Sequence, residues 1–371
     1  MTIKLPASVV QFAAGDTTLF DNFVDYWNHY RSENGTKQYP YAKTDKDGKI
    51  ITFAQKEEAL NAMLLREVSK RSGVDATTMS PEAMATHPLI SWSVGTIVSQ
   101  MIDAVLPDTM VEGTSAFAEI RTLGLGETAV FDIQSRDLFP VTKVGRLGQR
   151  EAEMHKGYEK QVTLNPEGHM ITVGVSLFRV LTGQESLASF TSKAIRSIET
   201  EMTKDIYTAF YNGFLSLSTD STTGLRVTGY TQADLTKLAQ RVSSFSGGAK
   251  PIVLGTKVAL ANVLPEDANF RYQIDSEFVK LGYLRTIAGV DVLEMPQIAD
   301  WTNPFATYIS DSYLWIIAPG TDKLVKCVIG GGTISNVNGN YDNANLQVNA
   351  SFTKFWKAGI ITSGIGATIS L

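Results

Sequence analysis

The stretch from Asp132 to Gly213 constrains the fold more than any other part of the sequence. It begins with a polar, charged segment at residues 135–166, continues through an apolar, strand-like run at 170–180, and ends in one amphipathic helix predicted over residues 183–212. A charged segment that buries little of itself, joined to a long rigid helix, is poorly suited to enclose a small molecule. It is well suited to reach a neighbouring subunit, so the pattern favours self-assembly over catalysis.

Composition indicates a globular protein with a sizeable core. The chain has 371 residues, of which 43% are hydrophobic, enough for two domains or for one domain with large excursions. With 33 lysine and arginine residues against 38 aspartate and glutamate residues, the formal net charge is −5. This balance provides no positive field for gripping duplex DNA. Cys327 is the single cysteine, so a disulfide framework is excluded and a buried, unreactive thiol is expected.

The helix predicted over residues 183–212 has a defined start and one apolar stripe. Thr182 is expected to cap it, with Glu185 reaching back to complete a capping box. Apolar or small residues then recur at three- or four-residue steps: Leu187, Phe190, Ala194, Ile198, Met202, Ile206, Ala209 and Gly213. At 1.5 Å per residue the helix is about 45 Å long, so it is expected to form a spine of the fold.

The charged segment before the helix is predicted to be a long hairpin. Strand-like runs at residues 129–133, 161–164 and 171–175 flank a tip, residues 143–160, that is rich in charge and glycine and poor in large apolar residues. The alternative is a surface loop of about 30 residues, but loops of that length are uncommon unless they have a function.

The first 115 residues are predicted to be largely helical. Helices are expected at residues 16–30, at 53–72 with Gly73 as the C-terminal cap, and at 93–106, where Pro107 should end the helix.

A compact pattern of short helices and strands follows residue 223. Helices are predicted at 231–242 and 256–264, and strands at 251–254, 289–294, 313–318, 324–329, 345–356 and 360–371. Residues 345–356 alternate between apolar and polar, which indicates a long, half-buried strand with Lys354 on its apolar register. Glycines 330–332 are expected to form a flexible turn, because no helix follows them as a dinucleotide loop would require.

No sequence motif points to catalysis. The chain lacks a P-loop and a nucleophile elbow, and Ser351 and Lys354, which match a Ser-x-x-Lys motif, lie in a strand pattern where the motif should open a helix. The four histidines lack metal-ligand spacing, although His155 and His169 could meet across the hairpin. No run approaches the ~20 apolar residues of a membrane span. We therefore expect no enzymatic activity, cofactor, metal site or membrane association.

The order of these features resembles the major capsid proteins of tailed bacteriophages, which have the Hong Kong 97-type capsid fold. The resemblance covers residues 129–371. Residues 129–178 are similar to the extended arm called the E-loop, and the helix from Ser186 onward is similar to the spine helix of the peripheral domain. Residues 251–255 and 287–292 are similar to parts of the axial domain.

The resemblance implies an α+β fold with an extended N-terminal arm, an E-loop hairpin, a peripheral domain with a long spine helix, and an axial domain. The implied intervals are 1–128 for the N-terminal arm or helical region, 129–182 for the E-loop hairpin, 183–220 for the spine helix, 221–322 for the axial domain and 323–371 for the return strands of the peripheral domain.

The resemblance also implies a function and partners. Such proteins form hexamers and pentamers that close into an icosahedral shell around double-stranded DNA, and the arm of one subunit lies over its neighbour. Implied partners are further copies of the chain and portal, scaffold or decoration proteins, in a virion assembled in the host cytoplasm. Arg146, Arg150, Lys156 and Lys160 of the arm would contact acidic residues of adjacent subunits. One exposed pair contributes little, but many repeated pairs can set register.

Three alternatives stay open on the sequence alone. An encapsulin-like compartment shell shares the fold, and a cargo-peptide groove would favour it. A two-domain α/β enzyme would use residues 132–183 as a lid that folds back on its own chain. A phage tail or adhesion protein would contain more β-structure and no spine helix.

Overall fold

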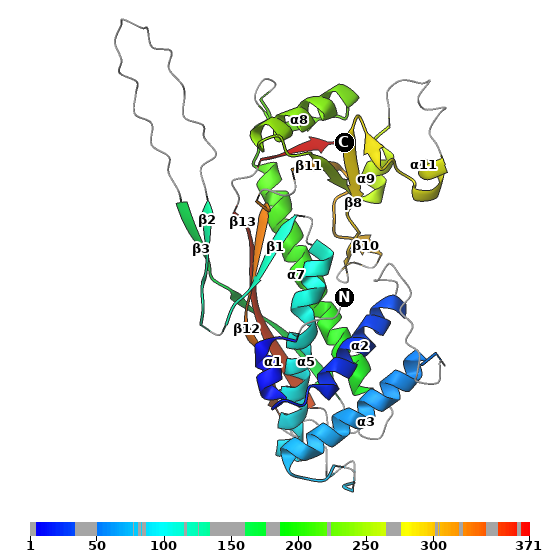
Figure 1. Ribbon diagram of the computed structural model, residues 1–371, viewed down its shortest axis with the longest axis vertical. Coiled ribbons are helices and arrows are strands. Elements are labelled where there is room, and N and C mark those ends of the chain that lie inside the picture. The colour runs from blue at the N-terminus through cyan, green and yellow to red at the C-terminus, as the bar shows by residue number, and fades with distance from the viewer. Residues whose placement is uncertain are drawn as a thin grey trace, which may run out of the picture.

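The computed structural model shows an elongated molecule arranged around one long helix, α7 (Leu187–Leu215) (Figure 1). A six-stranded sheet with helix α8 (Gln232–Phe245) lies at one end, and helices α2 (Thr18–Glu33) and α3 (Phe53–Ser72) lie at the other (Figure 1). The structure describes residues 5–33, 50–76, 78–80, 83, 87–114, 117–124, 126–133, 160–175, 186–220, 224–264, 276–300, 303, 305–318, 322–338, 348–361 and 365–371. The mixture of helices and sheets confirms the predicted α+β class.

Helix α7 is the predicted spine, but it begins four residues later than predicted. Thr182, the predicted cap, lies outside the described residues, and the observed N-cap is Ser186. The hydroxyl of Ser186 accepts a hydrogen bond from the backbone N–H of Ser189 at 3.2 Å. Serine supplies the same capping oxygen that threonine would, so Ser186 provides the kind of cap that was predicted for Thr182.

The spine is buried on more than the one predicted stripe. Leu187, Ala194, Ile198, Met202 and Ile206 of the stripe are buried as predicted. A second row is also buried, and it consists of Ala188, Thr191, Ile195, Tyr207, Phe210 and Phe214. Both rows are needed because α7 packs against helices on one side and against a sheet on the other.

The N-terminal region is helical, as predicted, and it packs into the main core. Helix α3 has the predicted bounds, with Gly73 in the left-handed conformation (φ 68°) as its C-terminal cap. At its start, Thr52 and Gln55 form a capping box that the sequence analysis missed. Helices α1 (Ala7–Phe12), α2 and α3 share one hydrophobic cluster with α7. Their described residues therefore form a packed layer, not an extended arm, because their apolar faces are too large to leave in water.

Helix α5 (Pro88–Thr114) was predicted to end at Pro107, and that prediction was wrong. Proline removes the N–H that would bond to the carbonyl of Asp103, and its ring crowds that carbonyl, so an isolated helix would end there. The turn beyond it is held by tertiary contacts. Met110 is fully buried, and the indole N–H of Trp27 donates to the Thr109 hydroxyl at 3.3 Å.

Helix α5 is also the one described helix that is long and apolar enough to cross a membrane, by length and composition only. The expectation that no run approaches a membrane span was too strict for residues 88–112. Of the most apolar window, 72% is buried inside the protein. A central helix of a packed core passes the same test, so this is weak evidence for a membrane span.

A four-stranded sheet in the order β1-β12-β13-β4 lies against α5 and α7. Its strands are β1 (Ala118–Thr122), β12 (Val325–Asn338), β13 (Val348–Ile360) and β4 (Glu167–Val175). Strands β1 and β12 are parallel, and the other two pairs are antiparallel. Ala350, Phe352 and Trp356 alternate on the buried face of β13, which confirms the long, half-buried strand that the sequence predicted.

Glycines 330–332 were predicted to form a flexible turn, but they lie inside β12. The register with β13 shifts between Gly330 and Ile334, which marks a bulge. Gly331 has a positive φ of 40°, and a Cβ atom on Gly330 would lie 3.0 Å from Cγ of Pro166. Here the glycines allow a bulge in β12 and the close approach of Pro166 to the backbone of Gly330. Local sequence alone does not distinguish these roles from that of a turn.

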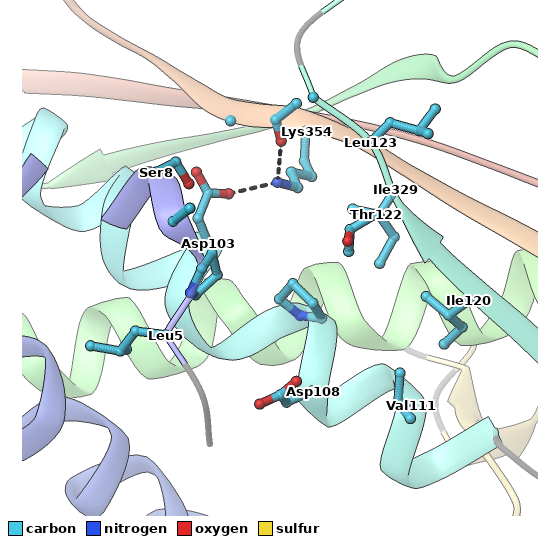
Figure 2. A pocket seen from close by; sticks show the side chains of 16 residues that line it. Leu5, Ser8, Asp103, Asp108, Val111, Ile120, Thr122, Leu123, Ile329 and Lys354 are labelled. Carbon is cyan, nitrogen blue, oxygen red and sulfur yellow. Dashed lines mark hydrogen bonds and ion pairs between the residues drawn. The ribbon is translucent and has the colours of Figure 1, made fainter. Parts of the chain in front are cut away.

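A buried ion pair joins α5 to this sheet (Figure 2). The Lys354 ammonium lies 2.6 Å from Asp103 Oδ1 and donates to the Gly331 carbonyl at 2.8 Å. Thr333 completes the site, because its backbone N–H donates to Asp103 Oδ2 and its hydroxyl donates to Oδ1. Both charged side chains are at most 5% exposed. Charges this deeply buried are tolerated only when they are paired and hydrogen-bonded, as they are here.

The six-stranded sheet has the order β5-β14-β11-β6-β8-β7. Its strands are β5 (Arg226–Thr228), β14 (Gly366–Ser370), β11 (Tyr313–Ile317), β6 (Ile252–Gly255), β8 (Val290–Glu294) and β7 (Thr286–Ile287). Helices α8, α9 (Lys257–Ala261) and α11 (Ser276–Leu281) accompany the sheet. A separate small hairpin consists of β9 (Ala299–Asp300) and β10 (Ala306–Thr307). Helix α8 matches the helix predicted at 231–242 and buries Leu235, Leu238, Ala239 and Val242, which lie on one helical face.

The final strand, β14, departs from the predicted division of the chain. Residues 323–371 were predicted to be return strands of the peripheral domain, and β12 and β13 do lie in the four-stranded sheet. Strand β14 instead pairs with β11 and β5 in the six-stranded sheet. The C-terminal strand thus ties the two sheets together across the end of α7, where Phe214 packs against Gly366.

Removing the Asp103 carboxylate should strongly destabilise the protein. The variant Asp103→Ala leaves the Lys354 ammonium buried without its counter-ion, which should lower the free energy of unfolding by about 3–5 kcal/mol. Urea unfolding followed by circular dichroism measures this loss. The double variant Asp103→Leu with Lys354→Met should recover most of it, and Lys357→Ala, which removes an exposed partner of Glu167, should change stability little. Equal losses in Asp103→Ala and Lys357→Ala would contradict this account.

Adding one methyl group at Gly366 should also be destabilising. The Cβ atom of Gly366→Ala would lie 2.6 Å from Cε1 and Cζ of the buried Phe214 ring. Because that ring has no free space to enter, we expect a loss of about 1–3 kcal/mol in thermal or urea unfolding. Phe214→Leu in the same chain should relieve part of the clash, so the two changes should be less than additive. Strict additivity would show that the two residues do not meet.

Candidate assembly surfaces

The root of the predicted hairpin is a two-stranded sheet. Strands β2 (Ala129–Ile133) and β3 (Lys160–Leu164) pair antiparallel, with Ala129 opposite Leu164 and Ile133 opposite Lys160. This confirms the two strand-like flanks that the sequence predicted. In Figure 1 the two strands stand to one side of the four-stranded sheet, with β2 and β3 side by side. The segment between them, 134–159, lies outside the described residues.

A small hydrophobic cluster fixes the hairpin root to the four-stranded sheet. Phe131 and Leu164 of the root pack with Val328 of β12 and with Ile361. Two cations lie over the Phe131 ring, with the Arg121 guanidinium 4.4 Å and the Lys326 ammonium 5.8 Å from its centroid. Apolar burial and cation–π attraction together hold the direction in which the root points.

Lys326 is the second buried lysine of the sheet, and it is shared by two carboxylates. Its ammonium lies 2.5 Å from Glu119 of β1 and 2.5 Å from Asp322. Partial burial raises the pKa of Glu119, but hydrogen bonds from Lys326 and Arg121 outweigh this and hold the pKa below its usual value. The strand register explains the pairing, because Glu119 lies opposite Lys326 in the parallel β1–β12 pair.

A groove of about 790 Å³ lies between α1, α5 and the four-stranded sheet (Figure 2). Its walls are largely apolar and include Leu5, Pro107, Val111, Ile120 and Leu123. The Asp103–Lys354 pair lies at one end of the groove, where the opposite charges compensate each other (Figure 2). Sequence analysis did not predict this groove, because its walls come from five segments that are separated along the chain.

The small hairpin β9–β10 carries an aromatic side chain that is fully exposed to solvent. Phe305 has a positive φ of 63° and a relative exposure of 106%. Single exposed apolar residues are common on protein surfaces, but a bulky residue in the left-handed region is unusual.

The sequence matches one known protein family over most of its length. Residues 41–357 match the family YonB, described as "SPbeta prophage-derived putative capsid protein YonB". The chain belongs to this capsid protein family. No curated protein matches the chain significantly.

Three solved structures are similar to this chain at low sequence identity. The mature capsid of bacteriophage PhiM1 has 13% sequence identity and a TM-score of 0.44, with 69% of this chain and 86% of that chain covered. The capsid of the native GTA particle has 12% identity and a TM-score of 0.47, covering 70% and 89%. A virus-like particle from Pyrococcus furiosus has 11% identity and a TM-score of 0.39, covering 71% and 97%.

Of the four arm residues predicted to contact neighbouring subunits, the structure describes one. Lys160 is exposed at the first position of β3, at the end of the root from which the hairpin continues. Arg146, Arg150 and Lys156 lie outside the described residues, so their contacts stay a prediction. The sequence analysis missed Phe305 and the groove, because exposure and concavity are properties of the folded chain.

The serine, lysine and histidine side chains that the sequence analysis considered as possible catalytic or metal-binding groups have other contacts in the structure. Ser351 contacts the hydroxyl of Thr172, whereas Lys354 points to Asp103 on the opposite face of β13, so the Ser-x-x-Lys match is not a catalytic pair. His169 stacks on Trp356 with ring centroids 3.8 Å apart, and His155 lies outside the described residues. Within the described part of the chain, no three His, Cys, Asp or Glu residues are grouped to hold a metal ion.

Cys327 should not react in the folded capsid protein. The side chain is fully buried on β12, and burial raises the pKa of its thiol to about 12. At pH 8 only about one thiol in 10,000 would then be a thiolate, the form that attacks alkylating reagents. Mass spectrometry after iodoacetamide treatment should therefore detect alkylation only when urea is present. Rapid alkylation of the native chain would contradict the burial of this strand.

Proposed function

We propose that this chain is a major capsid protein that assembles into hexamers and pentamers, and that these close into an icosahedral shell around double-stranded DNA. The observation that carries the proposal is membership of the prophage capsid protein family over residues 41–357. The fold supports it, because a hairpin root, a long spine helix and two sheets follow one another in the order expected of such a subunit.

In the proposed subunit, the parts of the chain have separate roles. The hairpin of residues 129–182 is the arm that reaches a neighbour, and α7 with the four-stranded sheet forms the peripheral domain. The six-stranded sheet with α8 and α9 forms the axial domain, which includes β14 from the C-terminal end of the chain. The chain's role is structural and not enzymatic.

The arm contributes the electrostatic part of the subunit contact. Arg146, Arg150, Lys156 and Lys160 contact acidic residues of adjacent subunits, as their clustering on one segment suggests. The hydrophobic cluster around Phe131 supports this role, because it fixes the arm at its root and so limits the conformational entropy lost when the arm binds.

The proposed partners are further copies of the chain, together with portal, scaffold or decoration proteins. The net charge of −5 fits a shell that encloses DNA without binding it in a sequence-specific way. We place the protein in the virion, after assembly in the host cytoplasm. The family match favours this function over an encapsulin-like compartment shell and over an enzyme.

Deleting residues 143–159 should leave a folded monomer that cannot form shells. The deletion spares Lys160 and the paired strands β2 and β3, so circular dichroism and the unfolding temperature should match those of the full chain. Negative-stain electron microscopy and size-exclusion chromatography should show rings or shells for the full chain and none for the deletion.

A charge-reversal variant separates the charge of the arm from its length. Arg146→Glu with Arg150→Glu and Lys156→Glu keeps the arm intact but should reduce shell yield, most strongly at low salt, where the lost attractions are least screened. Shells at normal yield from the variant that lacks residues 143–159 would contradict the proposed role of the arm. A full chain that stays monomeric would contradict the proposed function.

A further inference from the structure

Among the described residues of the hairpin β9–β10, Phe305 is the most exposed aromatic side chain. It stands immediately before β10 with its ring fully exposed and its backbone at φ 63°. Positive φ is unfavourable for a bulky residue and persists only where the surroundings enforce it. Because the ring makes no contact that would repay this conformation within the described chain, its benefit should come from contact with another molecule.

The base of this hairpin is rigidly attached to the spine helix. The Tyr308 hydroxyl lies 2.8 Å from the Thr208 hydroxyl on α7, and the Lys204 ammonium lies over the Tyr308 ring at 5.4 Å. Beside it, the backbone N–H of Ser310 donates to the Tyr207 hydroxyl at 3.1 Å. An exposed aromatic ring on a rigid base loses little entropy on binding, which is the property of an interface anchor.

The groove between α1, α5 and the four-stranded sheet is suited to accept such a ring. Its volume of about 790 Å³ exceeds that of a phenyl group, and Leu5, Pro107, Val111 and Ile120 supply apolar walls. Figure 2 shows Val111 and Ile120 at one end of the groove and the Asp103–Lys354 pair at the other. Because that pair is internally compensated, a ring that covers it leaves no new unpaired charge.

We propose that Phe305 of one copy of the chain inserts into this groove of an adjacent copy. This inference rests on the proposed self-assembly. The β9–β10 hairpin lies on one side of α7, whereas α1 and β1 lie on the other, so the ring and the groove belong to opposite sides of one subunit (Figure 1). A contact between unlike surfaces of identical subunits is heterologous, and its repetition closes a ring when the rotation between copies closes. The contact is therefore compatible with the cyclic symmetry of a hexamer or pentamer.

The first experiment compares two exposed phenylalanines. Phe305→Ala should lower the yield of rings and shells by about tenfold or more, because aromatic anchors dominate interface energies. Phe245→Ala removes another exposed ring, 63% exposed on α8 and away from the groove, and should assemble as the wild type does. Negative-stain electron microscopy and size-exclusion chromatography measure the yields, and circular dichroism checks that both variants fold.

The second experiment traps the contact directly. In a Cys327→Ala background, which has no other cysteine, chains with Thr307→Cys, an exposed position of β10 that leaves Phe305 in place, are mixed with chains with Val111→Cys and oxidised. A disulfide-linked dimer should form in the mixture, and not from Thr307→Cys chains alone or from Thr307→Cys mixed with Phe245→Cys. The first result requires the β9–β10 hairpin of one copy to reach the groove of another.

The outcomes separate this inference from the proposed function. Wild-type shells together with full assembly of Phe305→Ala, or with no disulfide in the Thr307→Cys and Val111→Cys mixture, would overturn the inference and leave the capsid function standing. A wild-type chain that stays monomeric would overturn both. A disulfide in the Phe245→Cys control would show non-specific collision and would also overturn the inference.

Discussion

Burial of the Lys354 ammonium dictates how the helices and the sheet of this protein fit together. The charge is stable inside the core only while the Asp103 carboxylate of α5 and the Gly331 carbonyl of β12 both reach it. The contact with Asp103 fixes the position of α5 along the sheet. The contact with the Gly331 carbonyl requires the bulge in β12 that the glycines allow. Because a half-formed buried pair is strongly unfavourable, other arrangements of α5 on the sheet are excluded. Helix α7 is then held between the N-terminal helices and β13.

A subunit fixed in this way is a rigid body that carries two projecting elements. One is the root of the arm, attached to the sheet through Phe131, and the other is the β9–β10 hairpin, attached to α7 through Tyr308. Rigid attachment matters for a shell, since each contact must repeat with the same geometry in every copy and small angular errors would accumulate around a closed surface. The same rigidity reduces the entropy lost when subunits associate.

Local periodicity predicted the helices and strands that bury a single face, such as α3 and α8. Their apolar residues recur at a regular spacing within one short segment, so the pattern can be read without knowing the rest of the fold. Predictions failed where a distant partner decides the outcome. Pro107 stays helical because Trp27 and Thr109 meet, and β14 joins the six-stranded sheet because its neighbour β11 lies there. The two strands at the root of the hairpin were predictable from their local sequence, whereas the groove and the exposure of Phe305 arise only when distant segments come together.

Charged and apolar contacts would have different roles in the proposed shell. Exposed ion pairs act over about 8 Å at physiological salt and are weakened by it, so the basic arm is suited to guiding and aligning subunits. A buried aromatic ring has no such long reach, but its contribution is little affected by salt and depends on the fit of the groove. A chain with a formal charge of −5 repels its own copies at long range. With the two proposed contacts, association would be favourable only in the one orientation where the basic arm meets acidic surface and Phe305 meets its groove, so identical subunits with weak individual contacts would select a single closed arrangement.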